Sequence, residues 1–128
     1  MKRRVLLLTL IILTLINILS GQNRSTTAEI TFEQLSHNFG TLEQGGEKVT
    51  HLFEFANTGE APLVIARTKT SCRCISIKTP KRPVMSGSKG VIEVSYDPKD
   101  VGVFNKSIDI HANIEGGYIT LFVTGEVK

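Results

Sequence analysis

Short runs in which apolar and polar residues alternate fill most of the chain after residue 29, and turn-forming residues separate these runs. In one of them, a single face carries Val49, His51, Phe53 and Phe55. A period of two predicts strands buried on one side, whereas a helix would repeat its apolar residues every 3.6 positions. The predicted strands are Ile30–Phe32, Val49–Phe55, Leu63–Ala66, Ile75–Ile77, Val91–Tyr96, Phe104–Ile110 and Tyr118–Val123.

Seven strands in a domain of about 100 residues predict an all-β, two-sheet immunoglobulin-like sandwich, with a closed barrel as the alternative. The run Leu63–Ala66 is apolar on both faces, so we expect it to be a central strand. The chain has no Trp, and aromatic side chains are expected to fill the core together with aliphatic ones. The expected aromatic core residues are Phe32, Phe39, Phe53, Phe55, Phe104 and Phe122.

The first 21 residues have the pattern of a secretory signal peptide. Lys2, Arg3 and Arg4 precede an apolar run from Val5 to Leu19, and Ser20 and Gly21 follow it. We expect a signal helix at 1–21 that is cleaved near Gly21, since the run is shorter than the roughly 20 residues that a permanent membrane anchor needs. Residues 22–29 are then a flexible tether, residues 30–128 are the domain, and the protein is periplasmic or secreted.

The net charge of +3 lies in the predicted leader, because Lys2, Arg3 and Arg4 supply all of it. Without them, 12 basic residues balance 12 acidic ones. The overall charge therefore gives no indication of a nucleic-acid partner. We expect contact with a membrane only through an uncleaved leader. We expect a monomer.

Charge is nevertheless uneven within the domain. Between Ala61 and Ile92 there is no acidic residue, but there are seven basic ones: Arg67, Lys69, Arg73, Lys78, Lys81, Arg82 and Lys89. They are candidates for contact with an anionic glycan, a lipopolysaccharide headgroup or an acidic envelope protein. The alternative is a solvated sheet edge on which lysines prevent unwanted strand pairing. The same stretch lacks aromatic residues, which argues against stacking on nucleic-acid bases.

Cys72 and Cys74 are the only cysteines, and export would place them in an oxidising compartment. On an extended strand their Cα atoms would be about 6.5 Å apart, near the upper limit for a disulfide, so a labile, exchange-active bond is one interpretation. A metal site with His37, His51, His111 or Met85 is a second, although none of these residues has metal-ligand spacing from the pair. A local structural link, or two half-buried thiols, is the third.

Other chemistry has little support in the sequence. No glycine-rich phosphate loop is present, so we expect no nucleotide cofactor, and we expect no bound metal. Ser36–His37 and Asp109 with His111 are the nearest approach to a catalytic triad, but both lie on alternating runs and no nucleophile elbow is present. His51 and His111 are expected to be half-buried strand residues, and the protein is not expected to be an enzyme.

Several motifs of the domain resemble a known bacterial family, the domain of unknown function family 1573. They are Phe39–Thr41, Phe53 and Phe55 before Asn57–Gly59, Pro62–Leu63, Ser71–Cys72 with Cys74, Gly87, Tyr96, Gly102, Asn113 and Gly125. The resemblance implies an exported bacterial protein with an immunoglobulin-like fold, similar to domains of cilium-associated and spindle-associated proteins. Two positions depart from the family pattern: Arg73 replaces a glycine between the cysteines, and Ser86 replaces a proline.

These observations predict an exported, non-enzymatic immunoglobulin-like module with a binding or structural role in a bacterial envelope. Such a module can bind an extended segment by strand addition, which needs no sequence motif. A redox or metal-carrier protein that uses Cys72 and Cys74 is the alternative.

Overall fold

The computed structural model describes Lys2 and residues 27–128 of the chain. Apart from Lys2, the predicted signal helix lies outside these described residues, as do its cleavage point near Gly21 and residues 22–26 of the predicted tether. In the part that is described, no helix has both the length and the apolar character needed to cross a bilayer.

Eight strands form two four-stranded sheets, so the predicted all-β immunoglobulin-like sandwich is confirmed and the closed barrel is wrong. Sheet 1 has the order β1-β3-β6-β5 and sheet 2 the order β2-β8-β7-β4. Neighbouring strands are antiparallel except for β2 and β8, which are parallel. The strands are β1 (Ile30–Phe32), β2 (Ser36–Leu42), β3 (Val49–Asn57), β4 (Ile65–Thr70), β5 (Ile75–Lys78), β6 (Lys89–Tyr96), β7 (Gly102–Ala112) and β8 (Tyr118–Val127).

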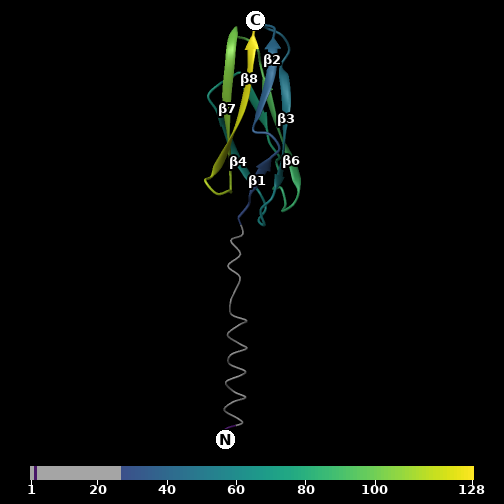
Figure 1. Cartoon of the computed structure of the whole chain (residues 1–128), viewed down its shortest axis with the longest axis vertical. Coiled ribbons are helices and arrows are strands. Elements are labelled where there is room, and N and C mark those ends of the chain that lie inside the picture. The colour runs from purple at the N-terminus through teal and green to yellow at the C-terminus, as the bar shows by residue number, and fades with distance from the viewer. Residues whose placement is uncertain (1, 3–26) are drawn as a thin grey trace.

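Short connections fix which edges of the two sheets lie together. Residues 33–35 alone link β1 to β2, and residues 71–74 alone link β4 to β5, so each connection crosses between the sheets over a short distance. One side of the sandwich is therefore bounded by β1 and β2, and the opposite side by β4 and β5. The sandwich is elongated along its strands, and its C-terminus lies at the end opposite the one where β1 begins (Figure 1).

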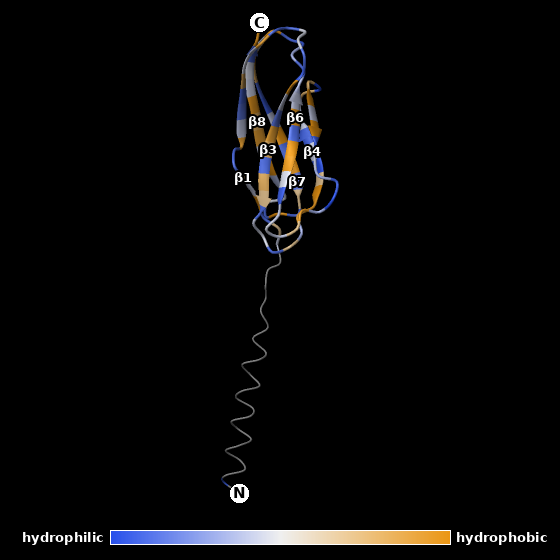
Figure 2. Ribbon diagram, turned by 90° about the vertical axis from the view of Figure 1, so that its right-hand side faces the viewer, coloured by the Kyte–Doolittle hydropathy of each residue, from blue (hydrophilic) through white to orange (hydrophobic). Residues whose placement is uncertain are grey.

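The core lies between the sheets, where inward residues alternate with outward ones. Hydrophobic and hydrophilic residues follow each other along the strands in Figure 2, as expected for strands with one buried side. On β3, Phe53 and Phe55 are 1% and 2% exposed, as predicted. Their buried partners come from the middle strands of both sheets: Ile92, Val94, Ile108, Ile110, Leu121 and Val123.

Two details of the predicted core are wrong. Phe122 faces outward and is 40% exposed, because its neighbours Leu121 and Val123 on β8 take the inward positions. The run Leu63–Ala66 is not a central strand. Leu63 makes an isolated bridge to Val84, and β4, which starts at Ile65, pairs only with β7 and forms the edge of sheet 2.

Strand β2 was not among the seven predicted strands. Its sequence, SHNFGTL, has only three half-buried residues, His37, Phe39 and Leu42. A register shift between Asn38 and Thr41 interrupts its pairing with β8 and breaks the alternation. The added strand completes sheet 2 and raises the count to eight.

The last residues of the predicted tether pack against the domain. Ala28 is 2% exposed and forms a bridge with Ile114. The carbonyl of Thr27 accepts hydrogen bonds from the backbone N–H groups of Glu60 (3.2 Å) and Ala61 (3.4 Å). Residues 27–29 therefore lie against the loop that follows β3.

Candidate functional site

Cys72 and Cys74 form a disulfide in the connection between β4 and β5. Their Cα atoms are 5.1 Å apart, closer than alternate residues of a strand, because residues 73 and 74 lie in a turn. Both side chains are half-buried and pack against the core, whereas Arg73 between them is exposed. The bond therefore fixes the point at which the chain crosses from sheet 2 to sheet 1.

The possible metal ligands lie apart from the cysteines. His37 on β2 and His51 on β3 stack on each other at the β1–β2 side of the sandwich, with ring centroids 3.7 Å apart. His111 is half-buried on β7, and its ring centroid lies 5.3 Å from that of Tyr118. Among the described residues, no group of three or more His, Cys, Asp and Glu side chains is arranged to hold a metal ion.

The seven basic residues between Ala61 and Ile92 are all exposed, and we call them the basic strip. They occupy β4, the disulfide turn, β5, the following loop and the first residue of β6: Arg67, Lys69, Arg73, Lys78, Lys81, Arg82 and Lys89. Lys78 pairs with Glu93, with Nζ 2.9 Å from Oε1. Within residues 27–128, the other six members make no ion pair.

On β4, Arg67 and Lys69 are on the outer face of sheet 2. They are in register with His111 and Asp109 of β7, which alternate with the fully buried Ile108 and Ile110. Asp109 lies opposite Lys69, but its Oδ1 accepts a hydrogen bond from Thr120 Oγ1 at 2.7 Å. The two cations of β4 therefore keep their charges available to solvent or to a partner.

Both ends of β4 are held by side chains. At its start, Asn113 Oδ1 accepts a hydrogen bond from the N–H of Val64 (2.7 Å), and Asn113 Nδ2 donates to the carbonyl of Pro62 (2.9 Å). At its end, the N–H of Cys72 donates to Thr70 Oγ1 (3.4 Å), and the disulfide closes the next turn. The side of β4 that faces away from β7 has no partner strand among the described residues.

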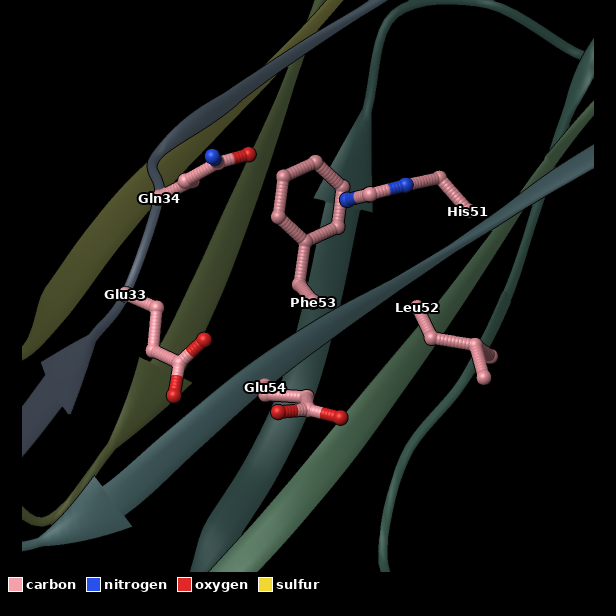
Figure 3. A pocket seen from close by; sticks show the side chains of 6 residues that line it. All are labelled: Glu33, Gln34, His51, Leu52, Phe53 and Glu54. Carbon is pink, nitrogen blue, oxygen red and sulfur yellow. The ribbon is translucent and has the colours of Figure 1, made fainter.

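A surface pocket of about 280 Å³ lies on the other side of the sandwich, where the chain leaves β1 and crosses to β2. Side chains from this crossing and from β3 line it (Figure 3), namely Glu33, Gln34, His51, Leu52, Phe53 and Glu54. The register between β1 and β3 ends at Phe32 and Phe55. Next to it, the N–H of Glu33 donates a hydrogen bond to the carbonyl of Glu54 (3.3 Å).

His37 and His51 join the two sheets next to this pocket. Their rings are nearly parallel, at 8°. Phe39 meets His37 edge-on, and Phe53 meets His51 edge-on, each with centroids 4.7 Å apart. Burial lowers the pKa of His51, and the nearby His37 lowers it further, because a charged imidazolium loses hydration there and is repelled by a second one.

Asn57 holds the loop after β3 in place. Its side chain is fully buried, and its Nδ2 donates to the carbonyls of Ala61 (2.8 Å) and Val84 (2.9 Å). Its Oδ1 accepts hydrogen bonds from the N–H groups of Gly59 (3.0 Å) and Glu29 (3.4 Å). A β-carbon at Gly59 would collide with the backbone of Glu29, so glycine is required there. The motif Asn57–Gly59 therefore has a structural role.

Similar solved structures share this fold at low sequence identity. A crystal structure of a protein of unknown function from Porphyromonas gingivalis W83 matches with a TM-score of 0.70 and 16% identity, over 84% of this chain and 50% of that one. The ASH/PapD-like domain 7 of human CEP192 matches with a TM-score of 0.61 and 12% identity, over 86% and 92%. The secreted serine protease VesC of Vibrio cholerae matches with a TM-score of 0.57 and 16% identity, over 82% and 24%.

The chain thus spans half of the Porphyromonas protein and about a quarter of VesC. No curated protein matches it. The profile of the family described as protein of unknown function DUF1573 matches residues 30–127, which extend from the first residue of β1 to the last residue of β8. The match includes Asn57–Gly59, the disulfide and Asn113. The chain therefore belongs to the DUF1573 family.

Proposed function

We propose that this protein is an exported, non-enzymatic module that binds an extended segment of a partner protein in the bacterial envelope along an open sheet edge. The basic N-terminal residues and the apolar run of the predicted leader support export. The immunoglobulin-like sandwich supports a binding role, because its edge strands offer unpaired backbone groups that a further strand can use.

One observation carries the binding role: β4 is an edge strand held at both ends. Asn113 fixes its start and the Cys72–Cys74 turn fixes its end, while its exposed side chains stay free of other strands in the described part. A strand that is already extended loses little conformational entropy when a partner pairs with it. This arrangement gives the disulfide a positioning role, and it favours binding over thiol exchange or metal transport.

The test uses the full chain expressed in a bacterial host. A photo-crosslinking residue replaces Ala66, an exposed, uncharged residue of the edge strand β4. In the matched control it replaces Val91, which is 41% exposed on the outer face of the central strand β6. We expect the purified protein to begin after Gly21 and to be recovered from the envelope fraction. We also expect a discrete cross-linked protein for position 66 and none for position 91.

Two results would contradict the proposal. Recovery of a chain that still begins at Met1 from the cytosol would rule out export. Equal cross-linking at positions 66 and 91, or none at position 66, would rule out a site at the β4 edge.

A further inference from the structure

The four edge strands of the sandwich differ in how well they could accept a partner. Strand β1 has only three residues, and β2 is interrupted by its register shift. Strand β5 has four residues, and its outward cation Lys78 already pairs with Glu93. Strand β4 has six residues, is held at both ends and carries two cations without an ion-pair partner among the described residues. It is therefore the edge best suited to strand addition.

The charges on β4 determine which strand can be added. Arg67 and Lys69 are two residues apart on the outer face, so a strand paired with β4 places every second side chain beside them. Opposite side chains in paired strands have Cβ atoms about 4.5–5.5 Å apart, within reach of a direct ion pair. Carboxylates at alternate positions would meet both cations, and a guanidinium can bind a carboxylate through two hydrogen bonds.

The surroundings of β4 favour the same partner. Arg73 follows directly at the disulfide turn. Asp109, the acidic residue opposite Lys69, makes no ion pair with it and accepts a hydrogen bond from Thr120. A second copy of β4 would bring like charges together, and a neutral strand would gain nothing from them. Cations that protect an edge from self-pairing therefore also select an acidic partner.

We infer that the free edge of β4 binds an extended protein segment with acidic residues at alternate positions, which adds to sheet 2 beside Arg67 and Lys69. This inference rests on the proposed function, since it names the partner for the same edge. The partner is a protein segment because the cations lie along a strand edge whose backbone groups are available for pairing.

The test measures binding of fluorescent peptides of about ten residues to the full chain by anisotropy. One peptide alternates Glu with Thr, a second has the same composition with all Glu residues in one block, and a third alternates Gln with Thr. A fourth is the alternating acidic peptide with N-methyl groups on every second amide, which remove backbone donors. We expect the first to bind about tenfold or more tightly than each of the others, and its affinity to fall as salt rises.

Matched variants locate the site. The double variant Arg67→Glu/Lys69→Glu should weaken binding of the alternating acidic peptide about tenfold or more. The double variant Lys81→Glu/Arg82→Glu changes the net charge by the same amount in the loop after β5, and it should weaken binding by less than about threefold. All four positions are exposed, so both variants should keep the circular dichroism and melting temperature of the parent.

The outcomes separate the inference from the proposed function. If the alternating Gln peptide binds as tightly as the acidic one and N-methylation abolishes binding, the edge accepts strands but the acidic preference is wrong. Equal loss of affinity in both double variants, or binding only to vesicles that contain anionic phosphatidylglycerol, overturns the inference in favour of a diffuse basic surface. If no peptide binds and no cross-link forms at position 66, both proposals fail.

Discussion

At the scale of single residues, Asn57 connects three parts of the chain. It is the one fully buried polar residue of the described core, and its side chain binds the backbone before β1, the loop after β3 and the strand-like segment at Val84. Its four hydrogen bonds to these segments satisfy both ends of the buried amide, and an unpaired buried polar group is costly. The motif Asn57–Gly59 therefore serves the architecture and not the chemistry of a site.

Replacing this side chain should destabilise the domain. We expect Asn57→Ala to lower the free energy of unfolding by about 2–4 kcal/mol, because four hydrogen bonds between its side chain and the backbone are lost. Urea denaturation followed by circular dichroism measures the change. Asn105→Ala, at an exposed position on β7, is the control and should change stability by less than about 0.5 kcal/mol. Equal midpoints for the two variants would contradict the structural role of Asn57.

At the scale of elements, β4 and β5 depend on the turn between them. The disulfide closes a loop of only three residues, since Cys72 and Cys74 are separated by one residue. The entropy that a disulfide removes from the unfolded chain grows with the length of the closed loop, so this bond can contribute little to global stability. Its main effect is on the direction of the chain at the end of β4.

We therefore expect the double variant Cys72→Ser/Cys74→Ser to lose only about 1–2 kcal/mol of unfolding free energy. Its affinity for the alternating acidic peptide should fall further than this small loss suggests, because the end of β4 becomes less ordered. Urea denaturation and anisotropy measure the two effects. The parent protein in a mild reductant should behave like the double variant. A variant that unfolds completely, or one that keeps full affinity for the peptide, would show that the bond has a different role.

At the scale of the whole molecule, stacked histidines join the two sheets on the β1–β2 side. The pKa of His51 lies below its ordinary value of 6.5, first because of burial and then because of His37. The unfolded chain therefore takes up a proton at this residue more readily than the folded one. Stability from this residue is complete above the unfolded pKa and is lost as pH falls below it.

We expect the melting temperature to fall between about pH 7.5 and about pH 5.5. His51→Gln removes the titrating group and should flatten this dependence. Melting curves at a series of pH values, recorded at constant ionic strength, test both statements. A parent protein with the same melting temperature throughout this range would contradict the assignment, and so would a variant as pH-sensitive as the parent.

Much of the fold could be predicted from alternation, and the failures have physical causes. Phe53 and Phe55 lie inside because Thr50 and Glu54 make the opposite face of their strand the more polar one. Phe122 has apolar neighbours on both sides, which leaves its orientation to tertiary packing. Strand β2 escaped prediction because a register shift breaks its pattern. The basic strip could be predicted from the sequence, because no acidic residue occurs between Ala61 and Ile92. The hydrogen bond that holds the start of β4 could not be predicted, because Asn113 and Val64 are 49 residues apart in the sequence.

The parallel pairing of β2 with β8 has a mechanical consequence. The chain begins the domain near one end and finishes it at the other (Figure 1). Tension applied to the two ends of the domain pulls β2 and β8 in opposite directions along their length. The hydrogen bonds between these strands are then loaded together in shear and do not open one after another. A domain pulled at its two termini would thus resist extension through its first and last long strands.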